Sequence, residues 1–248
     1  MERESERLIS TGIDKFNEIL GRGIPRNSMI LFLTDIGSES DIVALQILWN
    51  RLKAGDLGVI YDFDLPPMDL REKMKTYGWN LKKYEEEGKF ILADMFTHAF
   101  DLESFYPKEK YYCKRPTDIT YIGNFAHKLR EEILQRTQPG EYFGVILSAG
   151  RLLHFTGEDE ALKFVYASRM KYKPLGTALY LLDPRIASEK GLAMLENFAD
   201  IVIRFSVEKV SKRFNRFLRV IKSPLFGYLK EPLHYTITPT EGVVLSKE

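Results

Sequence analysis

A short polar stretch of the chain combines three carboxylates with two serines. It runs Thr34, Asp35, Ile36, Gly37, Ser38, Glu39, Ser40, Asp41. The preceding run, Met29–Leu33, is continuously apolar, as is typical of a strand buried on both faces. Apolar residues then recur at helical spacing over Ile42–Lys53. Because ligands of open α/β sheets bind at the carboxyl ends of strands, we expect the functional site in this loop.

These residue types suit more than one role. Ser38, Glu39 or Asp41 is suited to cap the helix that follows, which contributes about 1 kcal/mol, and this simple interpretation explains the residue types without a ligand. Alternatively, the oxygens of Asp35, Glu39 and Asp41, together with Asp64, suit a hard divalent cation, although their spacing matches no known loop motif. A third possibility is that the backbone amides of this loop still hold a phosphate.

The rest of the chain predicts one domain, residues 1–248, because it shows no internal repeat and no low-complexity linker. Further buried strands alternate with helical patterns. The predicted strands are Val59–Phe63, Phe90–Ala93, Tyr142–Leu147 and Thr177–Leu182, with antiparallel strands at Ile201–Val207, Phe214–Ile221 and near Leu233–Leu245. The aromatic and basic stretch Asp94–Arg115 lacks periodicity, so we expect an irregular surface segment there.

Composition sets limits on partners and location. Lys plus Arg number 36 against 35 for Asp plus Glu, so no overall field draws the chain to nucleic acid. Cys113 is the only cysteine, which excludes an internal disulfide and a multi-cysteine metal site and suits the cytoplasm. No apolar run approaches the about 18 residues of a membrane span, so we expect no membrane partner.

Several short motifs follow one another in a characteristic order along nearly the whole chain. They are Ser10-Thr11-Gly12-Ile13-Asp14, Gly23-Ile24-Pro25-Arg26, Ala44-Leu45-Gln46, Pro66-Pro67-Met68-Asp69-Leu70-Arg71, Tyr77-Gly78-Trp79, Tyr84-Glu85-Glu86-Glu87-Gly88-Lys89, Asn197-Phe198-Ala199-Asp200-Ile201-Val202-Ile203 and Leu218-Arg219-Val220-Ile221-Lys222. In order and spacing the chain resembles the KaiC-like and RadA-like ATPases of the RecA superfamily. The resemblance implies an α/β, RecA-like P-loop fold: a largely parallel central sheet with helices on both faces and C-terminal antiparallel strands.

The phosphate loop departs from that family. The resemblance puts Thr34 at the first glycine, Glu39 at the glycine before the lysine, Ser40 at the lysine and Asp41 at the magnesium-binding hydroxyl; only Gly37 is retained. Two like charges about 4 Å apart repel by about 1 kcal/mol in water and about 4 kcal/mol near a protein surface. We therefore expect a triphosphate to be repelled, and no cofactor, with ATP and magnesium disfavoured.

Two other catalytic features of the family are altered as well. The aspartate that supports magnesium corresponds to Leu147, which cannot bind a cation. Of the paired glutamates that polarise water, Asp64 keeps one carboxylate in shortened form and Leu65 loses the other. Hydrolysis by the family mechanism is therefore not expected, and we assign no catalytic residue.

A basic stretch near the C-terminus suggests a second kind of partner. It carries Lys209, Lys212, Arg213, Arg216, Arg219 and Lys222, interleaved with Phe214 and Phe217. Such a pattern suits single-stranded nucleic acid, but it equally suits a solvated strand edge protected by charge, which we favour. In relatives, a lysine and an arginine just after this strand reach the neighbouring subunit's nucleotide; here Lys222 remains and the arginine is missing.

Three functions remain open. The leading one is a non-catalytic scaffold or regulator that pairs with itself or with an active RecA/KaiC-like paralogue. The second is a nucleic-acid-binding paralogue of the recombinase type. The third is an ATP-binding protein with a divergent loop.

Overall fold

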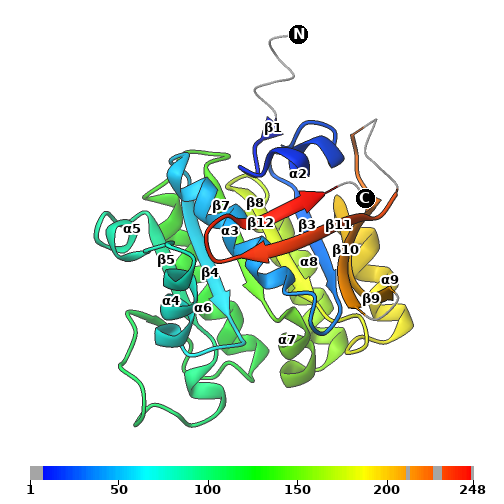
Figure 1. The fold of residues 1–248 in the computed structure, drawn as a ribbon. Coiled ribbons are helices and arrows are strands. Elements are labelled where there is room, and N and C mark those ends of the chain that lie inside the picture. The colour runs from blue at the N-terminus through cyan, green and yellow to red at the C-terminus, as the bar shows by residue number, and fades with distance from the viewer. Residues whose placement is uncertain (1–7, 211–212, 226–230, 247–248) are drawn as a thin grey trace.

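A twisted ten-stranded sheet runs through the molecule (Figure 1). The computed structural model describes residues 8–210, 213–225 and 231–246. In spatial order the strands are β12 (Gly242–Ser246), β11 (Leu233–Thr238), β10 (Arg213–Lys222), β9 (Ile201–Val210), β3 (Met29–Thr34), β8 (Gly176–Leu182), β7 (Tyr142–Leu147), β4 (Leu57–Asp62), β5 (Phe90–Asp94) and β6 (Tyr111–Tyr112). From β9 to β6 neighbouring strands are parallel, whereas β9 to β12 pair antiparallel.

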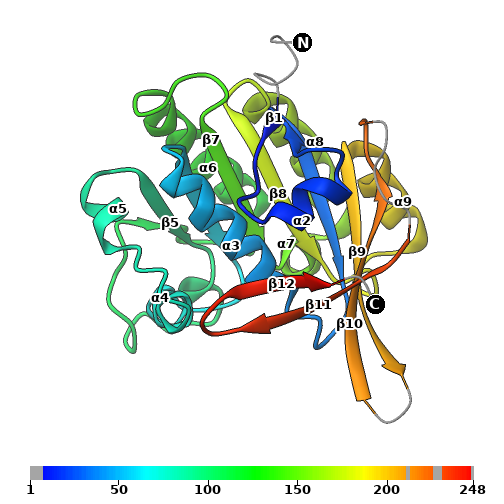
Figure 2. The same ribbon diagram turned by 45° about the horizontal axis from the view of Figure 1, so that its top comes forward.

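Helices cover both faces of this sheet (Figure 2). The helices of one face are α2 (Asp14–Ile19), α3 (Ser40–Lys53), α4 (Pro67–Thr76) and α5 (Lys82–Glu86). The helices of the other face are α6 (Ile119–Leu134), α7 (Ala149–Thr156), α8 (Glu158–Tyr172) and α9 (Glu189–Phe198). A small separate ribbon pairs β1 (Leu8–Ile9) with β2 (Ile24–Pro25). The expected α/β architecture, with a largely parallel sheet and C-terminal antiparallel strands, is confirmed.

The strand that leads into the polar loop lies at the centre of the hydrophobic core. On β3, Ile30 and Phe32 face α3, and Met29, Leu31 and Leu33 face the other helices, all of them buried. Removing each such side chain from water contributes about 1.5–3 kcal/mol. Burial on both faces therefore fixes where β3 ends and where the loop begins.

The segment after β5 differs from the expectation of an irregular surface stretch. It contains a short 3₁₀ helix, η1 (Thr97–Ala99), and the edge strand β6, and Cys113 within it is buried. The Cys113 amide donates to the carbonyl of Asp94, 2.9 Å away, which ties the segment to the end of β5. Burial raises the pKa of the Cys113 thiol to about 11, so this thiol is not a nucleophile at neutral pH.

The C-terminal strands return across α3, as Figure 2 shows. The amide of Val243 on β12 donates to the side-chain oxygen of Gln46 on α3 at 2.7 Å. The β9–β10 hairpin projects beyond the rest of the sheet. No helix in the described ranges is both long and apolar enough to cross a lipid bilayer.

Candidate functional site

A cleft of about 280 Å³ lies at the carboxyl edge of the parallel strands. Its walls come from the loop after β3, the turn after β4, the middle of α4, and the ends of β7 and β8 with the residues that follow them. The lining residues are Thr34, Asp35, Gly37, Ser38, Glu39, Ser40, Asp41, Asp64, Leu65, Leu70, Lys73, Leu147, Ser148, Gly150, Leu181, Asp183 and Ile186. The structure therefore places Asp64 and Leu147 beside the loop, as the resemblance implies. Ile36 also belongs to the loop, but it is exposed to solvent and does not line the cleft.

The turn from the loop into α3 does not use a capping side chain. The helix begins at Ser40, and Glu39 precedes it in a left-handed conformation with φ 52° and no side-chain cap. Ser38 instead bonds the hydroxyl of Ser40 at 3.3 Å, with both serines buried. The prediction that Ser38, Glu39 or Asp41 caps the helix is wrong: the N-cap residue is Glu39, its side chain makes no cap hydrogen bond, and Asp41 lies inside the first turn.

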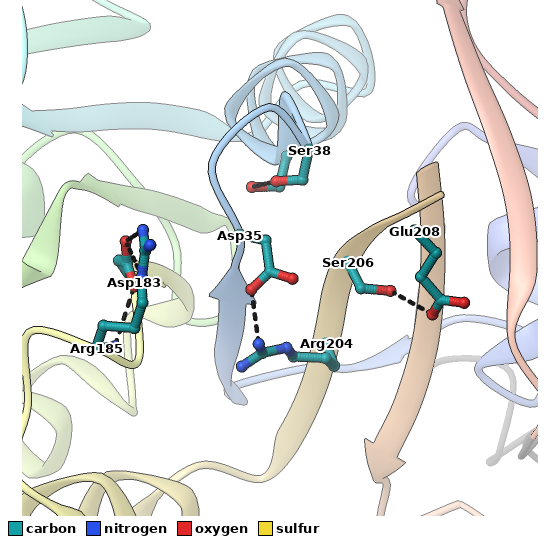
Figure 3. A network of polar contacts seen from close by, with 8 residues as sticks. Asp35, Ser38, Asp183, Arg185, Arg204, Ser206 and Glu208 are labelled. Carbon is teal, nitrogen blue, oxygen red and sulfur yellow. Dashed lines mark hydrogen bonds and ion pairs between the residues drawn. The ribbon is translucent and has the colours of Figure 1, made fainter. Parts of the chain in front are cut away.

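Each carboxylate of the loop forms an ion pair with a different element of the chain. Asp35 accepts from Arg204 on β9 at 2.6 Å (Figure 3). Glu39 lies 2.9 Å from the guanidinium of Arg216 on β10. Asp41 pairs with Lys73 on α4.

These pairs correct the electrostatic expectation for the loop. Counting only the three carboxylates of the loop overstates their repulsion of a phosphate, because three cations from distant parts of the sequence pair with them. A phosphate entering this loop would have to compete with these carboxylates for the same cations. Once displaced, those carboxylates would face the phosphates at short range.

The loop backbone is also fixed by the C-terminal strands. Nε of Arg216 donates to the carbonyl of Gly37 at 2.9 Å. The hydroxyl of Tyr235 on β11, a buried residue, donates to the carbonyl of Ser38. The loop is thereby anchored to β10 and β11 as well as to its flanking elements.

A second arginine–aspartate pair lies on the opposite side of β3 (Figure 3). Nε of Arg185 donates to Asp183, at the end of β8, at 2.9 Å. This hydrogen bond is the main reason that the pKa of Asp183 lies below its ordinary value, and the charges of Arg185 and Arg204 lower it further.

The carboxylate that the resemblance assigns to water activation is likewise occupied. Asp64 lies 3.2 Å from the guanidinium of Arg151 on α7. Arg151 in turn stacks over Phe96 and Phe100, with centroid distances of 5.4 and 5.5 Å. Leu147 is buried and lines the base of the cleft.

The cation site that the sequence offers as an alternative is not assembled. Asp35, Glu39, Asp41 and Asp64 each pair with a cation of the chain instead of converging on one point. Among the residues that the structure describes, no three His, Cys, Asp or Glu side chains form a group that could hold a metal ion. At the two loop positions where the resemblance puts the lysine and the magnesium-binding hydroxyl, this chain has Ser40 and Asp41, so these two side chains do not fit magnesium–ATP.

A buried carboxylate beside the cleft was missed by the sequence analysis. Asp62 ends β4, is fully buried, and accepts from the amides of Asp64 and Leu65 at 2.8 and 3.0 Å. Among the residues that the structure describes, its second oxygen has no hydrogen-bond partner. Burial, with smaller contributions from the charges of Asp64 and Asp94, raises the pKa of Asp62 to about 7. Asp62 thus shapes the turn that carries Asp64. The sequence signal that could have revealed it is that the neighbouring strands β4 and β5 each end in an aspartate, Asp62 and Asp94.

The basic stretch near the C-terminus is only partly available to a partner. Lys212 and the side chain of Arg213 lie outside the described residues. Lys209 and Arg219 are exposed, whereas Arg216 belongs to the loop contacts described above. The ammonium of Lys222 donates to the carbonyls of Glu196 and Asn197 at 3.0 and 3.1 Å.

Lys222 therefore stabilises the last turn of α9 within its own chain, where a cation complements the helix dipole. Its ammonium is therefore already engaged by two carbonyls of the same chain.

The sequence of the chain is similar to those of several known proteins. The sequence model described as "ATPase: KaiC" matches residues 9–248. A UPF0273 protein of Methanopyrus kandleri is 30% identical over 216 residues, covering 86% of this chain and 82% of that protein. A UPF0273 protein of Thermotoga maritima is 27% identical over 245 residues, covering 95% and 98%.

The fold is also that of a solved relative. The crystal structure of a KaiC-like protein from Pyrococcus horikoshii OT3 superposes with a TM-score of 0.72 at 20% identity, over 97% of this chain and 99% of that one.

Proposed function

The chain belongs to the KaiC ATPase family, and we propose that it is a member that does not hydrolyse ATP and acts instead as a scaffold or regulator of other proteins. The observation that carries this proposal is the state of the loop after β3. All three of its carboxylates are paired with cations of the same chain, and an aspartate stands where the family has a magnesium-binding hydroxyl.

The ion pairs alone would be a weak barrier, because exposed pairs contribute only about 0–1 kcal/mol each. The change of residue types matters more. Without the lysine, a triphosphate gains no cation of its own in the loop. Asp41 already places a negative charge in the first turn of α3, where the helix dipole would otherwise attract a phosphate.

Two contacts support the same conclusion at other catalytic positions. Arg151 neutralises Asp64, so this carboxylate is a poor candidate for polarising a water molecule. Lys222 is held by α9 and is therefore poorly placed to act on nucleotide bound by a neighbour.

Nucleic-acid binding is the less well supported alternative. Of the four described basic side chains in the C-terminal stretch, Arg216 and Lys222 already have partners within the chain. Lys209 and Arg219, with the exposed ring of Phe214, are what remains for a strand to contact. Fluorescence anisotropy with a single-stranded oligonucleotide at low salt distinguishes the two proposals: salt-dependent binding that Arg219→Ala weakens would favour nucleic acid.

Phosphate release from ATP by the purified full chain tests the proposal. We expect no magnesium-dependent release above the background without protein, and no further change on Asp64→Asn or Gly37→Ala. Release that either substitution lowers by about tenfold or more would refute the proposal, since such a loss identifies a working site.

A further inference from the structure

A second cavity lies on the other face of the sheet, beneath helices α6 and α8. It shares no lining residue with the cleft at the carboxyl edge. Most of its lining is apolar or aromatic and includes Met29, Phe63, Met95, Phe125 and Phe164. The volume of this cavity is about 60 Å³. A water-sized group needs about 10–15 Å³, so the cavity has room for about four to six such groups.

Four tyrosines from three strands and one helix line this cavity: Tyr61, Tyr142, Tyr172 and Tyr180. The hydroxyls of Tyr61 and Tyr172 lie 3.2 Å apart, and Tyr172 donates to the carbonyl of Ala126 at 2.7 Å. Burial raises the pKa of all four tyrosines, so their hydroxyls stay protonated at neutral pH. The interior is therefore neutral and of low polarity, which disfavours a charged occupant.

Two residues that line the cavity each carry a buried polar atom without a hydrogen-bond partner among the described residues. These atoms are Oδ1 of Asn27, which is an acceptor, and Nε of Arg169, which is a donor. Asp200 connects the two residues. It accepts from Nη2 of Arg169 and from the amide of Met29, two residues after Asn27, at 2.8 Å each. The unpaired donor and acceptor therefore both belong to the end of the cavity where β3 begins.

This combination restricts what the cavity can hold. Water is poorly suited to it, because a buried water needs about two to four polar partners and most of the wall offers none. A purely apolar molecule leaves both polar atoms unpaired, which is unfavourable. An anionic head would meet the oxygen of Asn27 and the carboxylate of Asp200, which already neutralises Arg169. A neutral head that both donates and accepts hydrogen bonds suits this end of the cavity.

We infer that the cavity binds a small neutral molecule with a short apolar body and an amide head. The carbonyl of the head accepts from Nε of Arg169, and its NH₂ group donates to Oδ1 of Asn27. The body lies against the aromatic and methionine side chains, because ligand sites combine a mainly apolar wall with a few placed polar groups. This inference goes beyond the proposed function, since the cavity is separate from the cleft and involves no triphosphate.

NMR titration of isobutyramide into the full chain, labelled with carbon-13 at the methionine methyl groups, tests the inference. Isobutyramide has six non-hydrogen atoms, which matches the size of the cavity. Met29 and Met95 line the cavity, whereas Met68 and Met74 lie on α4, on the opposite face of the sheet. We expect saturable shifts at Met29 and Met95, and none at Met68 and Met74. The dissociation constant should be about 1–10 mM, as suits so small a molecule.

Two molecules of the same shape test the head group. 3-Methylbutan-2-one has a carbonyl but cannot donate, and isobutyrate carries a charge. We expect each to bind about tenfold more weakly than isobutyramide, because each leaves at least one polar atom of the cavity badly paired. Equal affinity for the three molecules would overturn the inference.

Substitutions in the chain locate the site. Asn27→Gly removes the acceptor with little strain, because Asn27 has φ 63°, which glycine adopts readily. It should weaken isobutyramide about tenfold and change the affinity for 3-methylbutan-2-one less than about twofold. Ala178→Leu fills the cavity from β8 and should abolish the shifts, whereas Ala167→Leu, at an exposed position of α8, should leave them unchanged.

The outcome does not depend on any one variant. If Ala178→Leu does not fold, the comparison of Asn27→Gly with the wild type decides. The absence of saturable shifts at Met29 and Met95 up to about 100 mM isobutyramide would mean that the cavity holds at most water, and would overturn the inference. Shifts that Asn27→Gly leaves unchanged would do the same.

Discussion

Replacing Asp62 by asparagine should change how the stability of the fold depends on pH. Asp62 is fully buried at the end of β4, and burial raises its pKa from 3.8 to about 7. An asparagine keeps the oxygen that accepts from the amides of Asp64 and Leu65, but it cannot ionise. Any loss from the unpartnered amide group is the same at every pH and cancels when two pH values are compared.

The size of the effect follows from the two pKa values. A carboxyl whose pKa is raised in the folded state stabilises the fold below the unfolded pKa and loses that contribution as pH rises through the folded pKa. With values of 3.8 and about 7, the whole contribution is about 4 kcal/mol, of which about 2–3 kcal/mol is lost between pH 5 and pH 8. Asp62→Asn cannot ionise at this position, so its free energy of unfolding does not include this loss.

Chemical denaturation at pH 5 and pH 8 measures the difference directly. The free energy of unfolding of the wild type should fall by about 2–3 kcal/mol more than that of Asp62→Asn. Asp69→Asn, at an exposed aspartate on α4, is the control and should follow the wild type. If the wild type and Asp62→Asn lose the same free energy over this range, the burial argument for Asp62 is wrong.

Other substitutions test the packing of the fold away from the cleft, each by chemical denaturation. Arg51→Ala removes the guanidinium 2.7 Å from the buried Asp56 and should cost about 3–5 kcal/mol; a loss under about 1 kcal/mol would contradict the burial of the pair. Gly176→Ala places a Cβ 2.0 Å from the carbonyl oxygen of Tyr142 and should destabilise by at least about 1–3 kcal/mol. Gly123→Ala, on α6 with open space at its Cβ, should instead stabilise by about 0.5–1 kcal/mol. If Gly123→Ala destabilised the protein more than Gly176→Ala did, the packing described at these two glycines would be wrong.

The fold could be predicted because its signals are local. A strand such as β3 is continuously apolar, and α3 has a regular helical period, so each appears within a short window. The short helices α5 and α7 were missed. In α5 no residue is buried, and α7 follows β7 after a single residue, Ser148, so neither is set off by a clear pattern.

The charges of the site could not be predicted in the same way. The sequence shows Asp35, Glu39 and Asp41 side by side, but their partners come from residues 32 to 177 positions away in the chain. Nothing in the local pattern indicates that Arg204 and Arg216 reach the loop, since that depends on how β9 and β10 are placed beside β3. The contact of Lys222 with the end of α9 could not be foreseen for the same reason, because Glu196 lies beside it only in three dimensions.

The central claim is that the loop after β3 no longer accepts a triphosphate. Calorimetric titration of ATP with magnesium into the full chain tests it, beside a variant that restores the family residues, Glu39→Gly, Ser40→Lys and Asp41→Thr. We expect no heat of binding from the wild type up to about 1 mM ATP, with or without recovery in the variant. Saturable binding by the wild type at micromolar ATP would contradict the account.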